Sequence, residues 1–254
     1  MALAGQSPFS SALWFDYLNL RLNGPDFHQR LIRGEERYLD DRVRAVFEVW
    51  TFLIESGYFL PGIGDTNDFE ALATLVDGSG GPVTSTQTGM VLADPLAMVE
   101  LPENLRNQPG FFRFPIIEPT QPVGESLLVL GYIVPSCADN VEEAIEFLRY
   151  MGQAEVQAQI FQPSEQNLSY APVRTTDSRA YSEEIRRRMD VVINAEQVQA
   201  PYFLGNPTTM QMAIESALTQ FIDQTEQGTI YIDDVLLQLE AAREEARAGG
   251  EFVE

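Results

Sequence analysis

The residue types that most often carry catalysis or bind metal are scarce in this chain. It has one histidine, His28, and one cysteine, Cys137. One cysteine and one histidine cannot form the usual zinc sites, and a single cysteine cannot close an internal disulfide. The sequence also has no HExxH motif, no nucleophile elbow and no phosphate-cradling glycine loop. We therefore expect no metal, no cofactor and no enzymatic activity, and we expect His28 to be a surface or packing residue.

Acidic side chains are abundant, but their number does not argue for a hydrolase. Among 38 carboxylates, some pair is bound to lie at the separation that a glycosidase uses, so such a pair carries no weight alone. The 16 basic side chains leave a net charge of −22. This charge repels nucleic-acid backbones and anionic membranes, which argues against both as partners. The 44% hydrophobic content is enough to bury a core.

The apolar spacing predicts helices more often than strands. Over 40–57, apolar residues recur every three or four positions, which indicates a helix capped by Asp40 or Asp41 and ended by Gly57. In the helix expected over 67–76, we predict that Phe69 faces inward. Further helices are expected from the first turn after residue 8 and over 139–151, 154–161, 182–196, 207–227 and 232–247. Strands are expected over 1–4, 88–94, 111–117 and 127–134, and together these elements predict an α/β architecture.

The order of these segments resembles one protein family. The likeness rests on the N-terminal stretch ALAGQSPFSSALWFDYLNLRLNGPDFHQRLIRGE, on GYIVPSCADNVEEAIEFLRYMGQAEVQAQI and on MQMAIESALTQFIDQTEQGTIYIDDVLLQLEAAREEA. The first resembles the point where solute-binding proteins of sugar ABC importers, the maltose-binding-protein-like family, enter their C-terminal lobe. The other two resemble the family's strand with a helix pair and its terminal helical pair. The resemblance implies the C-terminal part of a type II periplasmic-binding-protein fold.

The resemblance also implies a domain organisation and partners. Residues 1–118 would be the first segment of the C-terminal lobe, 119–178 an insertion belonging to the N-terminal lobe, and 179–254 the closing helices and acidic tail. We therefore expect a truncated chain whose insertion lacks neighbouring strands. The implied partners are a small-molecule carbohydrate and, for the intact parent, the membrane permease of an ABC importer. The parent is expected to be a monomer outside the cytoplasm.

Sugar sites of this class combine aromatic faces with acids and amides that bind hydroxyl groups. The resemblance places Phe9 where the family commonly has a stacking aromatic, with Gln6 and Ser7 beside it as polar contacts. The alternative for Phe9 is a core anchor. Trp14 follows in the first helix, where it either lines the cleft or packs in the core.

Two later segments belong to the same expected cleft. Asp65 and Asn67 precede a helix, so they either face the ligand or cap that helix. The turn from Asp94 to Leu96 departs from the family, which often has a tryptophan there. A leucine offers contact area but no π face, so we expect the usual stacking interaction to be weakened at this position.

Tyr202 and Phe203 complete the candidate site, in a loop where family members present aromatics to the ligand. Their alternative role is packing of a proline-bounded loop. Other functions remain open at this point: a remnant that binds nothing, a binder of a solute other than sugar, or a glycosidase built on carboxylates.

Overall fold

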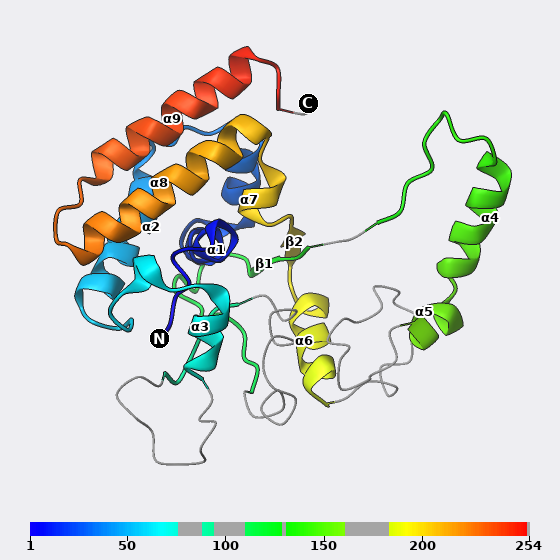
Figure 1. The fold of residues 1–254 in the computed structure, drawn as a ribbon, viewed down its shortest axis with the longest axis horizontal. Coiled ribbons are helices and arrows are strands. Elements are labelled where there is room, and N and C mark those ends of the chain that lie inside the picture. Colours follow the sequence, from blue (N-terminus) through cyan, green and yellow to red (C-terminus); the bar gives the residue numbers. More distant parts are fainter. Residues whose placement is uncertain (76–87, 94–109, 129–130, 161–182, 253–254) are drawn as a thin grey trace.

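The computed structural model describes residues 1–75, 88–93, 110–128, 131–160 and 183–252, and helices dominate them (Figure 1). In chain order the elements are α1 (Pro8–Ile32), α2 (Asp41–Glu55), the short 3-10 helix η1 (Ile63–Asp65), α3 (Asp68–Ala73), β1 (Gly124–Ser126), α4 (Val141–Met151), α5 (Ala154–Ile160), α6 (Glu183–Ile193), β2 (Gln197–Gln199), α7 (Tyr202–Gly205), α8 (Thr208–Glu226) and α9 (Ile232–Ala248). No helix in these ranges is long and apolar enough to cross a membrane.

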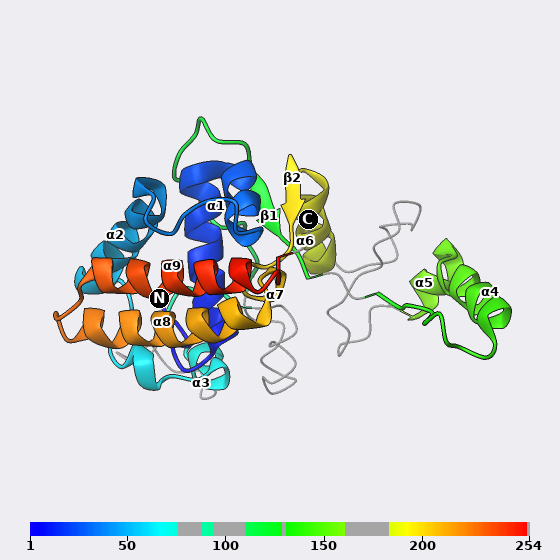
Figure 2. The same ribbon diagram turned by 90° about the horizontal axis from the view of Figure 1, so that it is seen from above.

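The main core forms around α1. Helices α2, α7 and α8 contact α1, and α9 runs along α8, as both ribbon views show (Figures 1 and 2). Phe221 of α8 is fully buried, with its ring 5.0 Å from the rings of both Phe47 and Trp50 on α2. Full burial of such side chains contributes about 1.5–3 kcal/mol each, so these contacts account for much of the stability of the helical body.

Helix α1 is bent at Gly24 and Pro25. Gly24 has φ +79° and ψ 164°, outside the helical region, and Pro25 cannot donate the backbone hydrogen bond of a regular helix. A Cβ at Gly24 would also lie 2.5 Å from the side-chain oxygen of Gln121. Glycine is favoured at this position by the backbone conformation, since the Gln121 side chain can move away from a Cβ.

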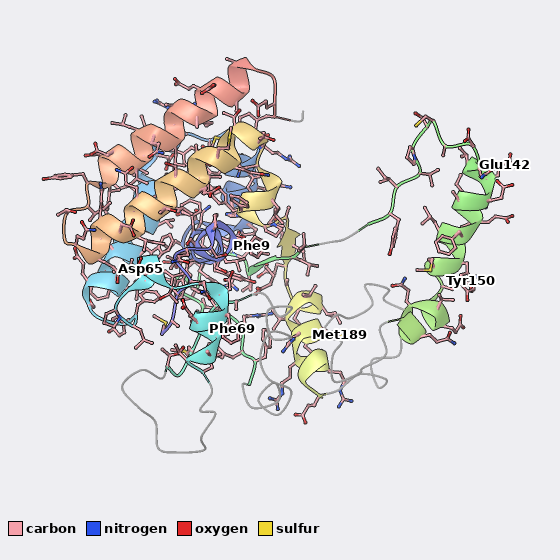
Figure 3. The ribbon with its side chains drawn as sticks, viewed as in Figure 1. Phe9, Asp65, Phe69, Glu142, Tyr150 and Met189 are labelled. Atoms are coloured by element: carbon pink, nitrogen blue, oxygen red, sulfur yellow. The ribbon has the colours of Figure 1, made fainter. Side chains whose placement is uncertain are left out.

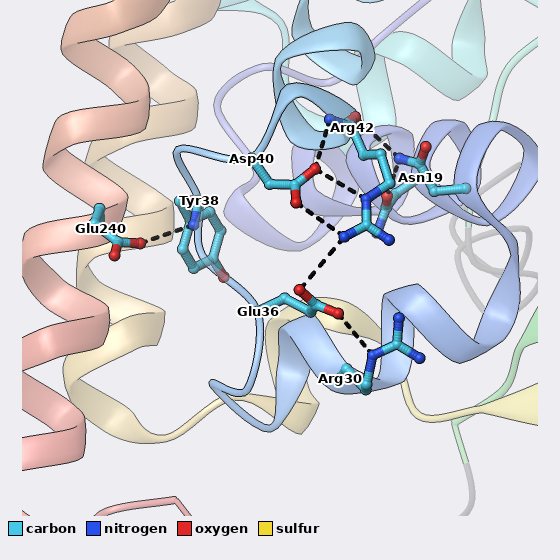
Figure 4. Close-up of polar contacts among 8 residues, drawn as sticks. Asn19, Arg30, Glu36, Tyr38, Asp40, Arg42 and Glu240 are labelled. Atoms are coloured by element: carbon cyan, nitrogen blue, oxygen red, sulfur yellow. Dashed lines mark hydrogen bonds and ion pairs between the residues drawn. The ribbon is translucent and has the colours of Figure 1, made fainter.

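Polar contacts fix the connection between α1 and α2 (Figure 4). Asp40 caps α2 by accepting from the Arg42 backbone N–H at 2.8 Å, which decides between the two predicted caps. The Arg42 side chain also donates to Asp40, and this hydrogen bond lowers the pKa of the Asp40 carboxyl. The backbone N–H of Tyr38 donates to Glu240 of α9 at 2.8 Å, so the connection is held from both sides.

The predicted strands are the main departure between sequence and structure. β1 pairs with β2 in parallel, with Gly124 opposite Gln197. Residues 111–117 form no strand, nor do the described residues of 127–134, so both predictions are wrong there. Of the strands expected over 1–4 and 88–94, the described residues show one isolated parallel bridge, Ala2 to Val91. An apolar run becomes a strand only where a partner strand satisfies its backbone groups.

The predicted helices are present, but the predicted inward residue Phe69 is not buried. Phe69 of α3 is 50% exposed, whereas Ala71 and Leu72 of this short helix are buried. Helix α4 has no buried residue, and its Phe147 is 56% exposed. In both ribbon views, α4 and α5 lie apart from the helical body (Figures 1 and 2).

Candidate functional site

Two loops bring several predicted site residues together at the start of α1. The Gly5 N–H donates to the Ile63 carbonyl, and the Gln6 N–H donates to the Thr66 carbonyl, each at 3.1 Å. A Cβ at Gly5 would lie 2.5 Å from the Ile63 oxygen, so glycine permits this approach. Residues 5–9 and 62–67 are therefore adjacent. Figure 3 shows Phe9 on α1, and Asp65 and Phe69 on the segment that ends in α3.

Two polar residues of these loops cap helices. Ser7 is the N-cap of α1 and accepts from the Ser10 N–H at 3.3 Å. Asn67 caps α3 in a reciprocal capping box with Glu70, both hydrogen bonds being 3.0 Å long. Gln6 and Asp65 are exposed.

The aromatic candidates lie in different environments. Phe9 is half-buried, so part of its ring remains accessible at the start of α1. Trp14 is 4% exposed and packs edge-on against Phe59 and Phe114, with ring centroids 4.8 and 5.7 Å away. This placement favours the packing alternative for Trp14.

The remaining candidates are not on this surface. Tyr202 is 1% exposed and lies in the core, where its hydroxyl is 2.6 Å from that of Tyr38 and its burial raises the pKa of the phenol. Phe203 is partly buried against the same core, which again favours packing. Asp94 and Leu96 lie outside the described residues.

Sequence reasoning missed a buried polar network inside α1. His28 is fully buried, as its packing alternative predicted, and its Nε2 lies 2.8 Å from Asp16 Oδ1. The other oxygen of Asp16 accepts from Ser126 Oγ of β1 at 2.8 Å and from the Tyr202 backbone N–H at 3.1 Å. One carboxylate thus holds α1, the end of β1 and the start of α7 together. The available signal was a charged residue in an otherwise apolar part of the helix.

Hydrogen bonds from Asn23 define the orientation of the Asn19 amide beside this network. The Asn23 amide nitrogen donates to the Arg42 carbonyl at 3.0 Å and to Asn19 Oδ1 at 2.7 Å. The other end of the Asn19 amide is therefore its NH₂ group, which donates to His28 Nδ1 at 2.8 Å. His28 Nδ1 is therefore the acceptor of this hydrogen bond, and His28 Nε2 lies 2.8 Å from Asp16 Oδ1.

A second buried cluster fixes β1 against α1. The Arg21 guanidinium lies 2.7 Å from Glu125 Oε1 and also donates to the Gly124 carbonyl. Arg113 approaches the same carboxylate at 3.2 Å and donates to the Val191 carbonyl of α6 at 3.0 Å. Burial raises the pKa of Glu125 despite both arginines. The cluster joins α1, the 110–118 segment, β1 and α6, so its role is to position elements.

Solved structures with this fold include two sugar receptors. The bacterial solute receptor AcbH, described as having an exclusive preference for β-D-galactopyranose, matches with a TM-score of 0.73 and 22% identity, over 94% of this chain and 58% of that chain. A chitin oligosaccharide binding protein matches with a TM-score of 0.68 and 13% identity, over 98% of this chain and 60% of that chain. No family model matches the sequence, and neither does any curated protein.

These matches confirm the α/β solute-binding-protein fold, the coarser part of what the resemblance implied. The chain has the helix-rich α/β fold of the two receptors and spans about 60% of the length of either. Both neighbours are binding proteins, and neither description names an enzyme, in agreement with the expected absence of catalysis.

Proposed function

We propose that this chain is a carbohydrate-binding part of a solute-binding protein that serves an ABC importer. The observation that carries the proposal is the structural match, over nearly the whole chain, to two receptors whose described ligands are both sugars. Ligand specificity varies within a fold, so the assignment of a carbohydrate ligand also needs support from the residues of the site. The surface formed by residues 5–9 and 62–67 contains the half-buried Phe9 and the exposed Gln6 and Asp65. An aromatic face with neighbouring hydrogen-bonding groups is what a pyranose ring requires.

The domain organisation belongs to the same proposal. Residues 1–118 and 179–254 form the C-terminal lobe of a type II fold, and 119–178 lead through β1, which packs on α1, into a second lobe. The separation of α4 and α5 from the helical body and the exposed side chains of α4 support this division. In the full-length parent, an additional segment completes the second lobe, the two lobes close around the sugar, and the monomer delivers it to a membrane permease outside the cytoplasm.

The test is the affinity of Phe9→Ala, introduced into the full-length parent, for a panel of sugars that includes galactose and chitin oligosaccharides. Loss of a stacking ring weakens sugar binding by roughly 1–3 kcal/mol, while the fold survives. The matched control is Phe52→Ala, because Phe52 is 60% exposed on α2. If Phe9 is a core anchor, Phe9→Ala instead lowers the free energy of unfolding by about 3–5 kcal/mol without a specific effect on ligand. A folded protein that ignores every sugar in the panel would favour a different solute or a non-binding remnant.

A further inference from the structure

The last residue of α8 holds the loop that carries part of the candidate site. One carboxylate oxygen of Glu226 accepts from the Gly62 N–H at 2.8 Å and the Ile63 N–H at 3.0 Å. Its other oxygen accepts from the Gly64 N–H at 3.1 Å. Successive backbone N–H groups that converge in this way form an anion-binding concavity, which here is filled by a side chain of the same chain. Hydrogen bonds to a carboxylate are stronger than those between neutral groups, so Glu226 is a firm anchor for the loop.

The anchored loop in turn sets the position of the N-terminal turn. Gly62 adopts φ +81°, and Thr66 closes the loop by donating from its hydroxyl to the Gly62 carbonyl at 2.7 Å. The Ile63 and Thr66 carbonyls then accept from the N–H groups of Gly5 and Gln6. A continuous set of hydrogen bonds therefore runs from Glu226, through residues 62–66, to the backbone of Gln6.

We propose that Glu226 is a positioning residue for the carbohydrate site. It fixes Asp65 directly, through the loop that contains it, and Gln6 indirectly, through the backbone pairing of the two loops. Glu226 acts from behind the loop and does not contact the sugar. This role rests on the proposed function, and it extends the site to a residue some 160 positions away in the sequence, where no local pattern marks it.

The decisive variants are Glu226→Gln and Glu226→Ala. Glutamine keeps the shape of the side chain but replaces one acceptor by an NH₂ group, which faces a backbone N–H. The control is Glu215→Gln, which makes the same charge change at an exposed position of α8. Amide hydrogen exchange, measured without ligand, should become about tenfold faster or more at residues 5, 6 and 62–64 in both Glu226 variants, because a charge-assisted hydrogen bond is lost. The rates should not change in the control.

Sugar affinity, measured in the full-length parent, supplies the second readout, using galactose and chitin oligosaccharides as probes. Both Glu226 variants should bind about five- to tenfold more weakly, the scale of one lost hydrogen bond to a charged group. In a double-mutant cycle, we expect the variant with both Gln6→Ala and Glu226→Gln to lose less affinity for sugar than the product of the two single fold-losses, because both residues act through one loop. A purely structural role would give independent effects.

The outcomes separate this role from the proposed function. If amide hydrogen exchange at residues 5, 6 and 62–64 is unchanged in the Glu226 variants, the positioning role is wrong, even if the protein without these substitutions binds sugar. The positioning role is also wrong if the loss of affinity in the double variant equals the product of the two single losses. If the parent binds no sugar while exchange does accelerate, the loop anchor stands as a structural contact, and the proposed function and the role of Glu226 in binding both fail.

Discussion

At the scale of single residues, buried polar groups explain how α1 is fixed in place. Asp16 is 1% exposed, yet it accepts hydrogen bonds from two other segments and contacts His28. A buried carboxylate is tolerated only when its oxygens are satisfied, so the neighbours of Asp16 are as important as its charge. The same reasoning applies to Glu125, which Arg21 and Arg113 both approach. These residues stabilise the arrangement of α1, β1 and α7, and α1 begins at the candidate site.

The first prediction concerns Asp16. Asp16→Asn keeps the shape of the side chain but turns an NH₂ group toward N–H and O–H donors, which leaves buried groups unpaired. We expect the free energy of unfolding to fall by about 2–4 kcal/mol. Denaturant unfolding measures this, with Asp41→Asn as the control, since Asp41 is exposed in the first turn of α2. Equal stability of the two variants would show that the network contributes nothing.

The second prediction concerns the buried phenols Tyr38 and Tyr202. Burial raises the pKa of both, and their hydroxyl groups lie 2.6 Å apart. The unfolded chain loses these protons near pH 10, whereas the folded protein keeps them. Unfolding therefore releases protons above that pH, and stability falls as the pH rises.

Ultraviolet absorbance of phenolate measures the effect. In the native protein both tyrosines should ionise only as the protein unfolds in alkali. A native titration that superimposes on the titration in denaturant would contradict the buried pair.

At the scale of elements, local signals predicted the helices and failed for the strands. Asp40, Asn67 and the three- to four-residue apolar spacing act within a few residues of one another, so the sequence shows them directly. A strand depends on a partner that lies elsewhere in the chain. Ser126 is 110 positions from Asp16, and no spacing rule connects them. The loop cluster at Gln6 was predictable only through a family resemblance, and its anchor at Glu226 was not predictable at all.

The third prediction contrasts two phenylalanines on different helices. Phe221 of α8 is fully buried, whereas Phe147 of α4 is 56% exposed. We expect Phe221→Ala to lower the free energy of unfolding by about 3–5 kcal/mol through the cavity that it leaves. Phe147→Ala should change it by less than about 0.5 kcal/mol, because this side chain has little packing to lose. Similar losses in both variants, measured by denaturant unfolding, would show that α4 packs into a core in solution.

At the scale of the whole molecule, the structure combines a well-packed helical body with a helix pair that is not packed on it. The body contains the candidate loops, and α4 presents apolar side chains to solvent. Exposed apolar surface of this kind favours association with another polypeptide. The two receptors are longer than this chain. Under the proposed function, a corresponding additional segment would cover the apolar surface of α4 and would also supply the opposite wall of the sugar site.

The fourth prediction is the affinity of this chain by itself. Ligand pockets usually enclose most of the surface of a small molecule, and a wall formed only by residues 5–9 and 62–67 leaves one side of a sugar in water. We expect dissociation constants of about 1 mM or weaker, a binding free energy no better than about −4 kcal/mol. Calorimetry at high sugar concentration gives the value, and amide shifts at Gly5 and Gln6 report whether the weak binding occurs at the proposed surface. A micromolar ligand would show that this chain already contains a complete site, and the two-lobe proposal would then be wrong. If the NMR shift changes are confined to other surfaces, the sugar binds away from Phe9 and the proposed site is wrong, although the fold is unaffected. Binding at such a surface would not depend on the loops that Glu226 anchors.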